Sequence, residues 1–161
     1  MFGKPLSYYL GAQAPALIAI LVVFFIRLVM SMAGVPDSAG KILSITLVLF
    51  LALPYYALVA KREGLGFKHL YAMCFIQGVY SQTLVALAIA LAILTGHDNI
   101  YTIPEFYPPS QGVDPAPFPL DGKNWMHAGA HVIFAGALAI PLVSWAVSSI
   151  LLVIARKVKS W

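Results

Sequence analysis

The chain has 161 residues, of which 61% are hydrophobic and 10% are charged. Soluble domains contain about a quarter charged residues, so this composition excludes a water-soluble globular domain and is typical of an integral membrane protein. The formal net charge of +4 does not indicate a nucleic-acid-binding protein, because the basic residues lie at the ends of apolar stretches rather than in one patch.

Four stretches of the chain are apolar and long enough to cross a bilayer, which requires about 20 residues per helix. We expect membrane-spanning helices at about 12–34, 42–60, 69–95 and 125–154. The first stretch contains Arg27 and is too long for the apolar part of a signal peptide, which favours a span. The sequence therefore predicts an all-α membrane protein with four transmembrane helices, in which residues 1–161 form a single domain.

Basic residues are concentrated on one side of these predicted spans. They precede the first span, occupy the loop between the second and third spans, and follow the fourth: Lys4, Lys61, Arg62, Lys68, Arg156, Lys157 and Lys159. Because basic loops stay in the cytoplasm, both termini are predicted to be cytoplasmic and the protein to be a multi-pass component of the cell membrane. The loop 96–124, between the third and fourth spans, is then outside.

The outer loop 96–124 contains many prolines and aromatic residues. It has six prolines and also Tyr101, Phe106, Tyr107 and Phe118. A solvated linker would be richer in serine, glycine and charged residues. We therefore expect this loop to pack against its own helices or against a partner subunit.

Two histidines near the start of the fourth span are four residues apart. At this spacing His127 and His131 lie on one face of an α-helix, a geometry that suits one metal ion. No glutamate follows His127, so the HExxH motif of zinc proteases is absent. Asp98 and Glu105 of the outer loop are predicted to complete a metal site of nitrogen and oxygen ligands.

A b-type haem is an alternative cofactor at the same end of the bundle. Two histidines of one helix cannot be the two axial ligands of one haem, so His127 or His131 would need a partner from another span. His97 is at the right level, whereas His69 is predicted to lie roughly 40 Å away at the other end of the third span. Hydrogen-bonded structural histidines, without any cofactor, are the third interpretation.

Arg27 is the most costly residue to place in a predicted span. An intramembrane arginine normally has a partner or extends to the headgroups. The predicted partners are His131, Glu105 or an acidic ligand group, so Arg27 is also a candidate cofactor-binding residue. Polar residues of the third span, including Gln77 and Ser81, are expected to form hydrogen bonds between helices. The alternative is that they hold a quinone headgroup near Arg27.

Gly129 and Gly136 are predicted to lie opposite the imidazoles and to let another helix approach closely. Together with the outer loop, this face favours a small accessory subunit of a larger, energy-transducing membrane complex. The arrangement broadly resembles the small haem-carrying or anchor subunits of respiratory and photosynthetic complexes. The alternative is a haem- or metal-binding redox protein, and the third is a small transporter or membrane-embedded enzyme, for which the chain has no catalytic motif and no mid-span carboxylate.

Overall fold

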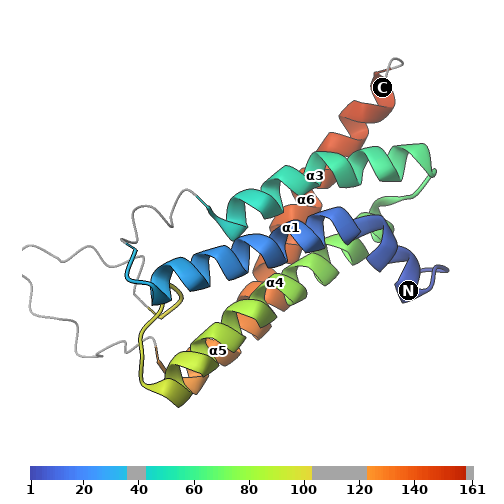
Figure 1. Ribbon diagram of the computed structural model, residues 1–161. Coiled ribbons are helices and arrows are strands. Elements are labelled where there is room, and N and C mark those ends of the chain that lie inside the picture. Colours follow the sequence, from blue (N-terminus) through green and yellow to red (C-terminus); the bar gives the residue numbers. More distant parts are fainter. Residues whose placement is uncertain (36–42, 103–122, 159–161) are drawn as a thin grey trace, which may run out of the picture.

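The computed structural model describes residues 1–35, 43–102 and 123–158, and these ranges contain four long apolar helices (Figure 1). They are α1 (Leu6–Met32), α3 (Ile45–Arg62), α4 (Phe67–Thr95) and a fourth rod from Trp125 to Lys157. Each is long and apolar enough to cross a membrane. The predicted all-α fold with four membrane-spanning helices is confirmed, while most of the outer loop lies outside the described residues.

The fourth rod changes its helical type along its length. It consists of α5 (Trp125–Ala130), the π-helical segment η1 (His131–Ala139) and α6 (Ile140–Lys157). In a π-helix each N–H bonds the carbonyl five residues back instead of four, as Ile140 N–H does to Ala135 O. The sequence predicts a membrane-spanning helix over this stretch but does not indicate the π-helical segment.

Two glycines bring the π-helical segment into backbone contact with α4. A Cβ atom on Gly78 of α4 would lie 2.6 Å from Gly136 O, and one on Gly136 would lie 3.2 Å from Gly78 O. The Cα–H groups of the two glycines are therefore directed at each other's carbonyls, a weak hydrogen bond found where helices cross closely. In the π register the donor to Gly136 O would be Pro141, which has no N–H, so this carbonyl is available to α4.

This contact corrects the predicted partner surface. Gly136 packs inside the chain, so the expectation that it faces a partner subunit is wrong, whereas the Cβ position of Gly129 has no described atom within 4 Å. On an α-helix His131 and Gly136 would be about 140° apart. Bonding between residues five apart places them on the same side instead, and both meet Gln82 of α4.

The centre of the bundle is α4. It packs against α1, α3, α5, η1 and α6, which are all the other helical segments of the described chain. Apolar side chains fill the bundle in two clusters, one around Tyr9, Tyr56, Leu70 and Leu152 and the other around Ile20, Phe24, Val85 and Ile89. Polar side chains that α4 presents to its neighbours are consequently withdrawn from lipid and water.

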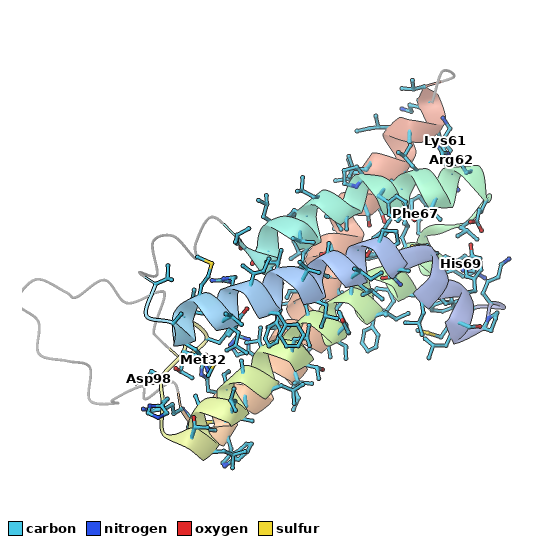
Figure 2. The ribbon with its side chains drawn as sticks, viewed as in Figure 1. Met32, Lys61, Arg62, Phe67, His69 and Asp98 are labelled. Carbon is cyan, nitrogen blue, oxygen red and sulfur yellow. The ribbon has the colours of Figure 1, made fainter. Side chains whose placement is uncertain are left out.

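Both ends of the described chain lie at one end of the bundle. Tyr9 Oη donates to Met1 O at 3.0 Å and Lys61 Nζ donates to Val158 O at 2.9 Å. Figure 2 shows Lys61, Arg62, Phe67 and His69 at this end and Met32 and Asp98 at the opposite one. We call the first the basic end, after Lys61, Arg62, Lys68, Arg156 and Lys157. That it faces the cytoplasm remains a prediction.

The glycine contact can be tested with one methyl group. We expect Gly78→Ala to lower the free energy of unfolding by about 1–3 kcal/mol, because its Cβ would overlap Gly136 O and press on the Pro141 ring. Thermal denaturation in detergent measures this change. Gly129→Ala is the control and should cost nothing, since its Cβ points into open space; equal melting temperatures for the two variants would contradict the contact.

Candidate functional site

The two histidines of the fourth rod converge on one point. His127 lies on α5 and His131 begins η1, and their ring centroids are 4.8 Å apart. The two Nε2 atoms are separated by 3.1 Å, and both side chains are partly buried. The Asn124 side chain caps α5 by accepting the His127 N–H at 2.7 Å, which fixes the helix start one turn before the pair.

Gln82 of α4 fixes the orientation of the deeper histidine. Its Oε1 lies 2.6 Å from His131 Nδ1, and the Gln82 side chain is buried. An amide oxygen only accepts hydrogen bonds, so His131 Nδ1 bears the proton and a neutral His131 has its lone pair on Nε2. The hydrogen atom between the two rings is then bonded to His127 Nε2, which donates it to His131 Nε2.

This arrangement has the geometry of two neighbouring metal ligands. With metal–nitrogen bonds of about 2.0–2.1 Å, nitrogens 3.1 Å apart subtend about 100° at a single ion. The contact from Gln82 to the remote nitrogen is of the kind that holds metal-binding histidines in one tautomer and one orientation. A metal ion and the shared proton would compete for the same point between the rings.

Of the other predicted ligands, the structure describes His97 and Asp98, and neither joins this pair. His97 follows α4 at its exposed end, and Gln82 is 13 residues before Thr95, which is about 20 Å along the helix. Asp98 forms a salt bridge with Lys123 at 3.2 Å. Among the described residues no three His, Cys, Asp or Glu side chains gather closely enough to hold a metal, and Glu105 lies outside those residues.

Arg27 contacts the ring of Tyr101, which was not among its predicted partners. Its guanidinium carbon lies 5.3 Å from the centre of the Tyr101 ring, and Tyr101 stacks on Phe24 of α1 at 5.5 Å. Asn99 holds this turn against the bundle through Nδ2, which donates to Ala88 O at 2.8 Å. The start of the outer loop therefore packs on its own helices and covers Arg27, which is 7% exposed.

A pocket of about 340 Å³ lies beside this turn, between the ends of α1 and α4, and does not include the histidine pair. Its lining residues are Ser31, Met32, Leu91, Thr95, His97, Asp98 and Asn99. Met32 and Asp98 mark its position in Figure 2. Among the described residues neither Arg27 nor a tyrosine lines it, so it does not match the predicted quinone site.

Two polar contacts were not predicted from the sequence. Gln82 was not predicted because a lone amide in an apolar helix normally indicates helix packing, and its contact with His131 depends on how two distant helices pack. At the basic end, His69 Nδ1 lies 2.7 Å from Tyr9 Oη, and both side chains are buried. A tyrosine near a membrane–water boundary normally lies among the lipid headgroups, whereas Tyr9 faces the protein interior.

Comparisons with protein-family models, with curated proteins and with solved structures found no match to this chain. Its function is therefore argued from the histidine pair and its surroundings.

The role of Gln82 can be tested by removing its acceptor. We expect Gln82→Leu to lower the free energy of unfolding by about 1–3 kcal/mol, because it leaves His131 Nδ1–H buried without its partner. Chemical or thermal denaturation in detergent measures the loss. Gln82→Glu preserves an acceptor at this position and should recover most of it; equal losses for both variants would show that the oxygen is not what matters.

Proposed function

We propose that this multi-pass membrane protein binds one first-row transition-metal ion through Nε2 of His127 and Nε2 of His131. The observation that supports the proposal is the 3.1 Å separation of these two nitrogens, with Gln82 fixing the tautomer of His131. Imidazole nitrogen suits Zn²⁺, Cu²⁺, Ni²⁺ and Fe²⁺ rather than Mg²⁺ or Ca²⁺. The proposed role is therefore metal binding with open coordination positions for water or a substrate.

The surroundings of the pair favour a functional site over simple packing. π-helical segments are rare within α-helices and are frequent at functional sites. Here the π segment begins at His131, which meets Gln82 of α4, while the α-helical turn before it places His127 beside His131. A haem receives less support, because His97, the predicted second axial ligand, follows the end of α4 about 20 Å along the helix from Gln82.

A second candidate role is that of an accessory subunit in a larger, energy-transducing membrane complex. It is favoured by the incomplete ligand set, since two described histidines leave positions that a neighbouring subunit could complete. The surface around Gly129 is open, and the adjacent Trp125 and Met126 are 62% and 84% exposed. With the basic end in the cytoplasm, this surface and the histidine pair would face the outer side of the cell membrane.

A transporter or a membrane-embedded enzyme has the least support. The carboxylates among the described residues are Glu63 and Asp98, and both follow the end of a helix rather than lying within a span. Ion and proton pathways through a bilayer normally use ionisable side chains near its centre.

Metal binding is tested with protein purified in mild detergent and stripped of metal. We expect isothermal titration with Zn²⁺ and Cu²⁺ to give one site per chain, with affinity falling as the pH is lowered because protons compete for the imidazoles. His127→Ala and His131→Ala should each abolish this site. His97→Ala is the matched control and should retain it, because His97 lies far from the pair; unchanged binding in His131→Ala would overturn the proposal.

The accessory role is tested by the size of the native assembly. We expect the 17.4 kDa chain to migrate in blue native gels, extracted from its own membrane, within a larger complex that contains other polypeptides. Gly129→Leu should release the chain from this complex without unfolding it, since the Cβ position of Gly129 has no described atom within 4 Å. A chain that migrates alone in mild detergent would contradict this role.

A further inference from the structure

Three oxygen atoms on fully buried side chains, in the half of the bundle nearer the basic end, have no hydrogen-bond partner among the described residues. They are Gln13 Oε1 on α1, Tyr56 Oη on α3 and Gln77 Oε1 on α4. All three side chains are 0% exposed. A buried polar group without a partner is costly, so three from three different helices need an explanation.

The positions of these oxygens are fixed by other contacts of the same side chains. Gln13 Nε2 donates to Tyr9 O at 3.2 Å, and Gln77 Nε2 donates to Leu49 O at 3.5 Å. Because each amide nitrogen is held on a backbone carbonyl, each amide oxygen points the other way. Neither side chain can turn to satisfy its oxygen without giving up the bond from its nitrogen.

The three helices meet at this level of the bundle. Tyr55 Oη donates to Ala12 O at 2.9 Å, which places the residues next to it, Tyr56 and Gln13, at the same height on α3 and α1. Tyr56 and Cys74 belong to one cluster of buried side chains, and Gln77 is one helical turn after Cys74 on α4. Gln13, Tyr56 and Gln77 therefore lie on three helices that pack against one another in pairs in this half of the bundle.

We propose that Gln13, Tyr56 and Gln77 form an internal polar site that binds ordered water. The set offers two carbonyl acceptors and one hydroxyl that both donates and accepts, which matches a molecule with two hydrogens and two lone pairs. Buried water typically makes about three hydrogen bonds to polar groups left unsatisfied by the protein. This site is separate from the histidine pair and does not depend on metal binding.

A neutral occupant fits this site better than an ion. No carboxylate of the described residues lies within the helices around it, and a cation in a bundle interior without a counter-charge is strongly disfavoured. Water instead satisfies the amide oxygens and the hydroxyl at once. It would link α1, α3 and α4 through two amide oxygens and one hydroxyl that have no partner among the described residues.

The site is tested by removing one hydroxyl and following thermal unfolding in detergent. The free thiol of Cys74 is buried, so its reaction with a thiol-reactive dye reports unfolding, with circular dichroism as a second readout. If water is bound, Tyr56→Phe removes one of its partners and lowers Tm by roughly 2–4 °C. If the site is dry, the same substitution removes an orphaned hydroxyl, and Tm stays the same or rises, which overturns the proposal.

A double-mutant cycle shows whether the groups act together. We expect Tyr56→Phe and Gln13→Met to be non-additive, because each removes a partner of the same water. Tyr55→Phe with Gln77→Met is the matched control and should be additive, because the Tyr55 hydroxyl donates to Ala12 O instead. Additive effects in the first cycle, or a Tm that changes when Na⁺ or K⁺ is replaced by choline, would contradict a shared water.

Discussion

The close approach of Gly78 and Gly136 is the interaction on which the rest of the structure depends. A Cβ atom on Gly78 would lie only 2.6 Å from Gly136 O, so no larger residue fits on α4 at this crossing. The contact holds the fourth rod against α4, the helix that packs against every other described segment. Without a hydrophobic force between helices inside a bilayer, such close backbone packing is the main source of attraction between them.

The same crossing determines what the histidines can do. The π register places His131 on the side of the rod that faces α4, one helical turn of α4 beyond Gly78, where Gln82 meets its Nδ1. The second nitrogen of His131 is thereby directed at His127. A packing constraint between two glycines and the chemistry of two imidazoles are thus parts of one arrangement, and the proposed metal site follows from both.

The sequence was sufficient to predict the four spans, because apolar run length in a bilayer leaves few alternatives to helices. It also placed His127 and His131 side by side, since four residues remain close on either kind of helix. It could not predict the π register, which depends on Pro141 and on contact between two distant glycines, and so it assigned Gly136 to the wrong face. The contacts of Gln82 and Tyr101 depend on tertiary packing and have no local signal in the sequence.

The measurement that tests the central claim most directly is X-ray absorption at the metal edge of the Cu²⁺- or Zn²⁺-loaded protein in detergent. We expect two imidazole nitrogens at about 2.0–2.1 Å from the metal, with the multiple-scattering pattern of two histidine rings and the remaining ligands being light atoms. A spectrum with one histidine, or with none, would contradict the convergence of His127 and His131 on a single ion.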